Sequence, residues 1–339
     1  MAGEMAGWRK VLPMQLERKG QSVSALAGKS MADPPTLADL TAADSALVIG
    51  IGGGGDIVGA VPTARFLERH DVETWLGGLP WERPVVDPTP GPYPLDRIEG
   101  LELVSDTVGL ADGETRADDG VAFAECRVAD VLEERVALLD ITEGPGDLAA
   151  GLETACNAMG IDCIVGVDAG GDALARGNES GIRSPIADAI SVAALDATAL
   201  PTAIGIFGWG SDGELTPDEL DASLAEVAAA DGLLGAWGLT PEVCAELDTL
   251  FEVVPTEASR LPVEAARGDL GQRRIRDGTR SLRLTAASTV TFYLATNRVA
   301  RVSDPVTLVH ATESLEAAHE SLRAAGYITE LAIERGEVD

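Results

Sequence analysis

Residues 48–56 read Val-Ile-Gly-Ile-Gly-Gly-Gly-Gly-Asp, and this stretch decides the fold class. An apolar run passes directly into four glycines and an acid, and a helical pattern follows over Asp56–His70. This order predicts a strand over Ala46–Ile51, a tight turn and a helix. The G-x-G-x-x-G pattern, in the strand-to-helix setting that a phosphate-binding turn requires, is matched by Gly50, Gly52 and Gly55.

Two later stretches repeat this arrangement. Residues 164–172 read Ile-Val-Gly-Val-Asp-Ala-Gly-Gly-Asp, and residues 204–212 read Ile-Gly-Ile-Phe-Gly-Trp-Gly-Ser-Asp. Each is an apolar run, a glycine-rich turn and an aspartate, so we expect strands over Asp162–Asp168 and Ala203–Phe207. Common ancestry is not required, because turn chemistry alone favours glycine and aspartate.

Apolar runs alternate with helical patterns along most of the chain, which predicts an α/β fold. Three more helices are expected to begin at Ser184-Pro185, Thr216-Pro217 and Thr240-Pro241, where a hydroxyl can cap and proline suits the first turn. Other strands are expected over Val72–Leu79, Ile98–Val104 and Val136–Thr142, and other helices over Asp147–Met159 and Thr312–Gly326.

We therefore predict a Rossmann-like, doubly wound, mostly parallel sheet. Its α/β core spans residues 31–235, and a C-terminal α+β portion over residues 236–339 completes the same domain. Six prolines mark residues 80–97 as an extended loop over the surface or over a site, and residues 270–310 read as strands with short turns.

The chain is strongly acidic, with a net charge of −31 over 339 residues and a pI of about 4.3. Nucleic acid is therefore not expected as a partner, because phosphate backbones need a basic surface. The acids are spread through apolar, patterned sequence, so the chain should fold. We interpret the acidity as halophilic, because salt screens the self-repulsion of such a protein.

The first 30 residues differ in composition from the rest. All three lysines, Lys10, Lys19 and Lys29, lie here, and five basic against two acidic residues give this segment a net charge of +3. The remainder carries −34. We interpret residues 1–30 as a disordered or spurious extension before a natural start at Met31; a native basic tail is the alternative.

Several classes of protein are excluded by what the sequence lacks. No stretch reaches the roughly 18 apolar residues of a membrane span, and Val11-Leu12-Pro13 is too short for the core of a secretory signal, so we expect a cytoplasmic protein. No C-x-x-C pair, paired histidines, G-x-S-x-G or G-K-[ST] motif occurs. No lysine follows Met31, which excludes Schiff-base chemistry.

The three glycine-rich turns are expected to face one cleft, because ligands of open parallel sheets bind beyond the carboxyl ends of the strands. Gly52, Gly53, Gly54 and Gly55 would cradle a phosphate. Two features argue against an ordinary NAD site. Residues 76–79 read Leu-Gly-Gly-Leu where a ribose-binding acid is expected, and Asp56 would place negative charge beside a pyrophosphate.

The second turn is rich in acids. Asp168 and Asp172 could hold Mg²⁺, which prefers hard oxygen ligands, or either could act as a general base or bind a hydroxyl pair of a ribose or sugar. The alternative is that both cap turns, and that Asp188 lies on a solvated helix face. Further candidate ligand-binding residues here are Gly170, Gly171, Glu179 and Ser184.

The third turn offers Asp212 as a second candidate base beside Asp56, with Gly208, Ser211 and Glu214 as ligand-binding residues. Trp209 could stack on a base or ring, although packing in the interior is the alternative we favour. Five arginines gather at Arg273, Arg274, Arg276, Arg280 and Arg283. Arginine suits bidentate contact with a carboxylate or phosphate, but we favour pairing of these side chains with the protein's own acids or with another subunit. We interpret the Trp81-Glu82-Arg83 stretch as a candidate lid.

Several of these motifs together resemble an uncharacterised archaeal family, domain of unknown function 1152. The resemblance covers about residues 40–332 and is carried by the Gly52–Asp56 turn and by the sequences at 76–83, 167–174, 184–188, 211–215, 289–293 and 327–330. It implies a cytoplasmic archaeal protein in which these turns share a site. The resemblance implies no particular ligand and no particular activity.

These observations predict a Mg²⁺-assisted transferase or hydrolase that acts on a nucleotide, a nucleoside or a sugar phosphate. The alternative is a non-catalytic module that senses a nucleotide or metabolite. The expected partner is therefore a small phosphorylated or nucleoside-like ligand, and a homo-oligomer is compatible with either function.

Overall fold

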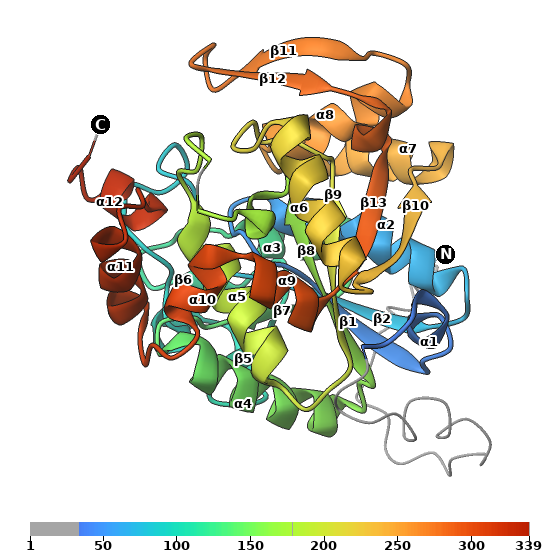
Figure 1. Ribbon diagram of the computed structural model, residues 1–339. Helices are drawn as coiled ribbons and strands as arrows, with labels where there is room; N and C mark the ends of the chain where they lie inside the picture. The colour runs from blue at the N-terminus through green and yellow to red at the C-terminus, as the bar shows by residue number, and fades with distance from the viewer. Residues whose placement is uncertain (1–33, 178, 339) are drawn as a thin grey trace.

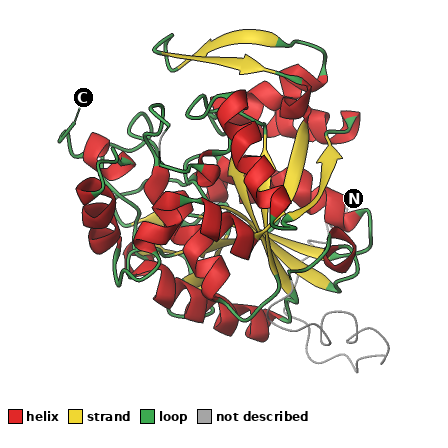
Figure 2. Ribbon diagram, viewed as in Figure 1, coloured by secondary structure: helices red, strands yellow, loops and turns green. Residues whose placement is uncertain are grey.

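The computed structural model describes residues 34–177 and 179–338, so the predicted extension over residues 1–30 lies outside the described part. A nine-stranded sheet runs through the centre of the molecule, with the order β10-β13-β9-β8-β1-β2-β7-β5-β4. Helices cover both of its faces (Figure 1, Figure 2). The fold is a mixed α/β fold with a large, mostly parallel sheet.

Five neighbouring strands are parallel: β7 (Val136–Leu139), β2 (Glu73–Gly78), β1 (Ser45–Gly50), β8 (Cys163–Ala169) and β9 (Thr202–Phe207). Because β1 pairs with both β2 and β8, the chain steps outward in one direction from β1 to β7 and then in the other from β8 to β9. The order of the strands therefore reverses between β1 and β8.

Antiparallel strands extend the sheet at both edges. β13 (Val290–Ala295) pairs with β9, and β10 (Leu233–Gly238) pairs with β13. At the other edge β5 (Val108–Ala111) pairs with β7, and β4 (Glu102–Leu103) pairs with β5. Since β10 and β13 belong to the central sheet, much of the C-terminal third is built onto the same core.

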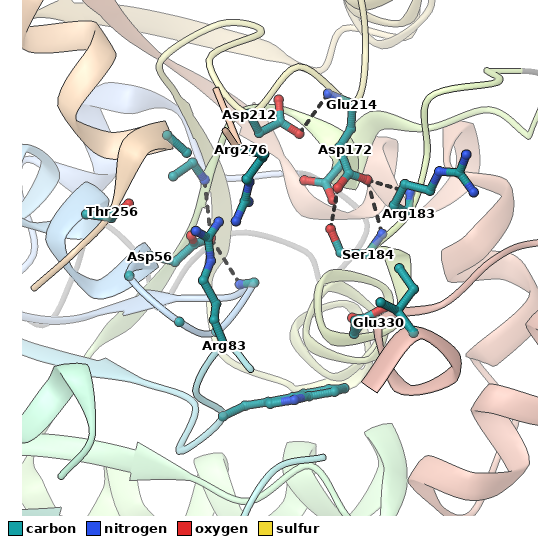
Figure 3. A pocket seen from close by; sticks show the side chains of 18 of the residues that line it. Asp56, Arg83, Asp172, Arg183, Ser184, Asp212, Glu214, Thr256, Arg276 and Glu330 are labelled. Carbon is teal, nitrogen blue, oxygen red and sulfur yellow. Dashed lines mark hydrogen bonds between the residues drawn. The ribbon is translucent and has the colours of Figure 1, made fainter. Parts of the chain in front are cut away.

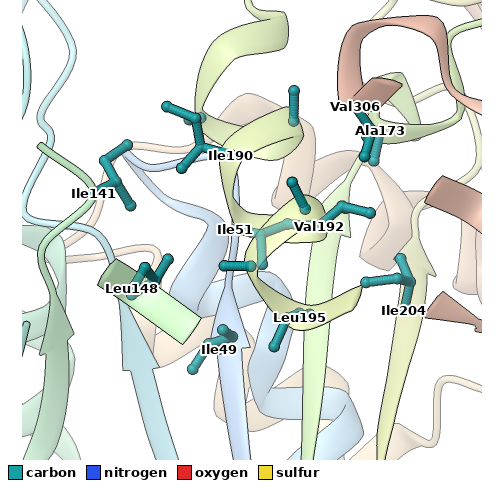
Figure 4. Packing of buried hydrophobic residues seen from close by; sticks show 14 of the residues in the cluster. Ile49, Ile51, Ile141, Leu148, Ala173, Ile190, Val192, Leu195, Ile204 and Val306 are labelled. Atoms are coloured by element: carbon teal, nitrogen blue, oxygen red, sulfur yellow. The ribbon is translucent and has the colours of Figure 1, made fainter. Parts of the chain in front are cut away.

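The apolar run of β1 is buried on both faces, as expected for a central parallel strand. Leu47, Ile49 and Ile51 pack with α4 (Gly144–Met159), α5 (Pro185–Ala197) and the helices α6, α9, α10 and α11 (Figure 4). The alternate residues Ala46 and Val48 face α2 (Asp56–Glu68), α3 (Ala124–Leu132) and α7 (Pro241–Leu250). Because side chains alternate along a strand, successive residues of β1 pack into the hydrophobic cores on opposite faces of the sheet.

The remaining elements surround this core. Their bounds are α1 (Leu37–Leu40), α6 (Pro217–Ala229), α8 (Glu257–Ala266), α9 (Thr296–Val302), α10 (Asp304–Val309), α11 (Leu315–Ala324) and α12 (Glu330–Glu334). Two small sheets pair β3 (Ile98–Glu99) with β6 (Arg116–Ala117) and β11 (Gly271–Ile275) with β12 (Arg280–Leu284). Short 3₁₀ turns are η1 (Leu95–Arg97), η2 (Asp172–Leu174) and η3 (Ala286–Thr289). Within the described residues, no helix has the length and apolarity to cross a membrane.

Several predicted elements are wrong in part. The strand expected over Ile98–Val104 is divided between β3 and β4, because Gly100 turns the chain at a φ of +81°. The end of the stretch 270–310 is helical, in α9 and α10, since apolar residues there recur at helical spacing. Ser184 precedes α5 as expected, but its hydroxyl does not cap the helix.

Candidate functional site

A pocket of about 550 Å³ lies at the carboxyl ends of β1, β8 and β9 (Figure 3). Its floor consists of the first glycine-rich turn and of acidic residues from the second and third turns. Its walls come from the loop after β2, the start of α8, the tip of the β11–β12 hairpin, and α12. These segments lie far apart in the sequence, so the pocket exists only in the folded chain.

The three glycine-rich turns are joined by hydrogen bonds. Ile51 N donates to Val167 O at 3.0 Å, and Gly210 N donates to Gly170 O at 2.7 Å. Ala169 N also donates to the Asp56 carboxylate at 3.3 Å. Because β8 lies between β1 and β9, its turn touches both of the others. The predicted convergence of the three turns is therefore confirmed.

The first turn needs its glycines. Gly53 and Gly54 have φ values of +73° and +65°, in the left-handed region that other residues seldom adopt. Gly54 N donates to Trp81 O at 2.7 Å, which fixes the loop after β2 against the turn. A Cβ at Gly55 would lie 2.5 Å from Thr256 Cβ, so α8 can approach only a glycine here.

Asp56, Asp168 and Asp188 form the first carboxylate cluster, which we call the Asp56 cluster. One carboxylate oxygen from each lies within 4.8 Å of the others. Asp168 accepts hydrogen bonds from Gly171 N at 3.1 Å and Ala173 N at 3.0 Å. A Cβ at Gly52 would be 2.6 Å from Asp56 Oδ2 and 3.1 Å from Asp188 Oδ2, so this glycine leaves room between two carboxylates.

Asp172, Asp212 and Glu214 form the second carboxylate cluster, the Asp212 cluster, with the same spacing of their oxygens. Glu214 is held firmly, because it accepts hydrogen bonds from Arg183 N at 2.7 Å and from Ser184 Oγ at 2.5 Å. Glu214 N in turn donates to Asp212 Oδ2 at 3.3 Å.

The site concentrates carboxyl groups away from water. Burial raises the pKa of Asp56 to about 8 and that of Asp168 to about 6. Burial, and then the neighbouring acids, hold the pKa values of Asp172, Asp188 and Asp212 well above their usual range. So many buried carboxyls cannot all ionise unless positive charge joins them.

Two buried carboxylate oxygens have no hydrogen-bond partner among the described residues. They are Asp188 Oδ1 and Asp212 Oδ1, one in each cluster, and the two side chains are 3% and 6% exposed. Buried polar atoms are rarely left unpaired, because each costs about 1–3 kcal/mol. The clusters therefore each have a vacant oxygen donor of the hard type that Mg²⁺ prefers.

Glu330 is a site residue that the sequence did not indicate. It lines the pocket and accepts hydrogen bonds from Ile186 N at 3.1 Å and Ala187 N at 2.8 Å, at the start of α5. It thus caps the helix that Ser184 was expected to cap. Burial raises its pKa to about 8. Its partners lie more than 140 residues earlier, so no local pattern marks it.

Not every predicted site residue reaches the pocket. The lining includes Gly52, Gly53, Gly54, Gly55, Asp56, Asp172, Ser184, Asp212 and Glu214, and Asp168 lies just beneath. Gly170, Gly171, Gly208, Ser211 and Glu179 are outside the lining. Gly170 has a φ of +140° and lies directly against the Asp212 carboxyl. A Cβ at position 170 would overlap that carboxyl. Glu179 accepts hydrogen bonds from Arg176 N and Gly177 N and closes their turn.

Two interpretations of single residues are decided by packing. Asp188 was expected on a solvated helix face, which is wrong, because α5 is buried and Asp188 faces the pocket. Trp209 is 1% exposed, packs on Phe292 and donates its Nε1–H to Asp221 at 3.2 Å. Stacking of Trp209 on a ligand is therefore wrong, and the packing alternative is confirmed.

Basic residues form part of the wall. Arg83, Arg183, Arg276 and Arg280 line the pocket, as do Trp81 and Glu82 from the predicted lid segment. The expectation that the arginines of residues 273–283 pair with the protein's own acids is confirmed for Arg273, with Asp269, and for Arg280, with Glu214 at 3.1 Å. Arg183 and Thr256 also line the pocket, but they could not be identified from the sequence, because neither belongs to a recognisable motif.

Comparison with known proteins places the chain in a family without assigning it a reaction. The family model described as "protein of unknown function (DUF1152)" matches residues 47–338, which is most of the chain and all of the pocket. No curated protein and no solved structure matches the chain. The chain therefore belongs to the family of domain of unknown function 1152.

Proposed function

We propose that this protein is an enzyme, a Mg²⁺-assisted transferase or hydrolase that acts on a nucleotide, a nucleoside or a sugar phosphate. One observation carries the proposal. Two buried carboxylate clusters, each with an unpartnered oxygen, open into the same pocket as a glycine turn at the start of α2. Acidic cation sites beside a backbone that approaches a ligand closely are the parts that phosphoryl chemistry uses.

The residues of the two clusters fit a hard divalent cation. All six are carboxylates, and the unpartnered Asp188 Oδ1 and Asp212 Oδ1 supply a donor to each cluster. When bound there, Mg²⁺ would neutralise the buried acids and the oxygens of a phosphorylated ligand.

The chain's own residues would perform the other tasks. Gly53–Gly55 have no side chains of their own, so their backbone N–H groups can approach the ligand closely. Asp212 is our candidate base when the cation occupies the Asp56 cluster, because Asp212 then lines the pocket with an Oδ1 that no described residue occupies. Asp172 orients the reacting group, and Asp56 is the second candidate base. A carboxyl with a raised pKa suits proton exchange near neutral pH.

The topology supports a more specific description of the fold. The parallel strands run in the order 3-2-1-4-5, which is that of Rossmann-type doubly wound sheets. In such sheets ligands bind where the order reverses, and here that point lies between β1 and β8, under the Asp56 cluster. We propose this fold, and a halophilic, cytoplasmic setting in which salt screens the net charge of −31.

A thermal-shift panel in molar KCl tests the proposal. Nucleotides, nucleosides and sugar phosphates are each added with and without Mg²⁺. A ligand at 100 times its Kd stabilises by about 2.7 kcal/mol. At about 0.7 kcal/mol per kelvin for a chain of this size, this raises the Tm by about 4 °C. A Mg²⁺-dependent shift with one class names the substrate class; no shift with any class contradicts the proposal.

Asp172→Asn then separates an enzyme from a binding module. With the substrate class identified, this variant should fold and lose at least 100-fold in turnover, within the range that general acid–base groups contribute. The matched control is Asp218→Asn, an equal change at an exposed position of α6. If the natural protein binds the ligand but shows no turnover, the non-catalytic alternative replaces the enzyme.

A further inference from the structure

The arginines of the pocket differ in how they are paired. Arg280 is neutralised by Glu214. The Arg83 side chain has no hydrogen bond or ion pair with any residue that the structure describes, although the chain has 56 acidic and only 25 Lys and Arg residues. Arg276 Nε is buried without a hydrogen-bond partner, and its one ion contact, to Glu257, is 4.0 Å long. Two guanidinium groups are thus left largely free in an acid-rich protein.

Arg83 lies at the glycine turn, and Arg276 lines the same pocket. A Cβ at Gly54 would be 3.3 Å from Arg83 Cγ and 3.5 Å from Arg83 Nε, so the Arg83 side chain lies across this turn. Figure 3 shows Arg83 and Arg276 both extending toward the Asp56 side of the pocket. Burial lowers the pKa of Arg83, which indicates that its position is not favourable for a charge without a partner.

The hairpin that carries Arg276 is anchored on both sides. Ile275 and Leu282 pack in a small apolar cluster with Leu261 of α8. Arg276 N donates to Glu257 at 3.1 Å, and Arg280 Nη1 donates to Asp212 O at 2.9 Å. The tip of the hairpin is therefore held at the pocket, and Arg276 is presented from a fixed backbone.

Arg276 also occupies a costly backbone conformation. Its φ is +53°, in the left-handed region, at a hairpin turn where glycine or asparagine is usual. Residues other than glycine adopt this conformation only at a cost in stability. A glycine at this position would remove the cost, so the presence of an arginine indicates that the arginine side chain has a function.

We propose that Arg83 and Arg276 form a subsite for a phosphoryl group, seated over Gly53–Gly55. The guanidinium fork matches the oxygens of a phosphoryl group in pairs. The N–H groups of Gly53 and Gly55 have no hydrogen-bond partner within the described residues, and they add donors at the start of the 13-residue helix α2. The inference rests on the proposed function for the class of ligand, and it assigns phosphoryl recognition to the hairpin.

Calorimetric titration of the whole chain with pyrophosphate, at constant KCl and with a chelator present, tests the subsite. Arg83→Gln and Arg276→Gln should each weaken pyrophosphate binding at least tenfold. Arg274→Gln, the same change at an exposed position of the same hairpin, should weaken it less than twofold. Arg276→Gly should lose affinity as Arg276→Gln does while remaining at least as stable, because glycine suits the left-handed φ. Malonate, a dicarboxylate, should bind the natural protein at least tenfold more weakly than pyrophosphate.

Three results would overturn the subsite: no pyrophosphate binding to the natural protein, equal losses in Arg274→Gln and Arg276→Gln, or malonate binding as tight as pyrophosphate. Mn²⁺ binding, followed by electron paramagnetic resonance, separates this failure from that of the proposed function. If Mn²⁺ binds but the arginine variants bind pyrophosphate normally, the subsite is wrong and the cation site stands. If pyrophosphate binding needs both arginines but no Mn²⁺ binds, the subsite stands and the Mg²⁺-assisted function is wrong.

Discussion

Glu330 should make the stability of the protein depend on pH. Its pKa is raised from 4.5 to about 8 by burial, so the folded chain keeps a proton that the unfolded chain releases. Between these two values the folded state binds more protons, and the free energy of unfolding therefore falls as the pH rises. The slope is about 1.4 kcal/mol per pH unit for one such group.

The perturbation is Glu330→Gln. An amide oxygen can still accept the hydrogen bonds from Ile186 N and Ala187 N, but the side chain no longer titrates. Between pH 5 and pH 7 the variant should therefore gain about 2.5 kcal/mol of stability relative to the natural protein. At about 0.7 kcal/mol per kelvin, this is a relative gain of about 3.5 °C in Tm.

The assay is chemical and thermal denaturation at pH 5, 6, 7 and 8, with constant KCl and a chelator to remove divalent cations. Glu320→Gln, which removes a carboxylate from an exposed position of α11, is the control and should follow the natural protein. The reasoning is refuted if the curves for Glu330→Gln and the natural protein stay parallel from pH 5 to pH 7.

Two further substitutions test the site and its support. Asp188→Asn should weaken Mn²⁺ binding at least tenfold. The cation-free variant should keep or gain stability, because the substitution removes a buried acid that lies among other acids. Unchanged Mn²⁺ affinity would exclude Asp188 as a ligand. Gly170→Ala should lower the free energy of unfolding by about 2–4 kcal/mol, since its Cβ would overlap the Asp212 carboxyl. Gly268→Ala, also at positive φ but with open space around its Cβ, should cost less; equal losses would show that φ alone matters.

The class of fold and the positions of the turns could be predicted from local sequence. The run over residues 48–56 passes from β-branched residues to glycine and then to a helix, and each step has a local cause in backbone preference. The parallel strands were predicted to within a few residues for the same reason. Local preference failed at Ile98–Val104 and in α9 and α10, where short apolar stretches suit a strand or a helix equally.

The convergence of three turns could be inferred because it follows from topology. Parallel strands bring their carboxyl ends to one edge of a sheet, so repeated turns after strands must lie near one another. Asp56, Asp172 and Asp212 were therefore found from their positions after strands. Asp188 could not be found in this way, because an acid four residues into a helix reads as a solvated residue until the neighbours of that helix are known.

By itself the sequence determined which residues carry charge, which backbone turns require glycine and where strands give way to helices, because these properties depend on neighbours along the chain. Only the tertiary structure decided which of those charges meet. Glu330 reaches the start of α5, and Arg276, from a hairpin more than 200 residues after the glycine turn, lines the same pocket as that turn. The burial of a side chain, its pKa and its lack of a partner depend on surroundings that long-range packing creates, so no local sequence pattern predicts them.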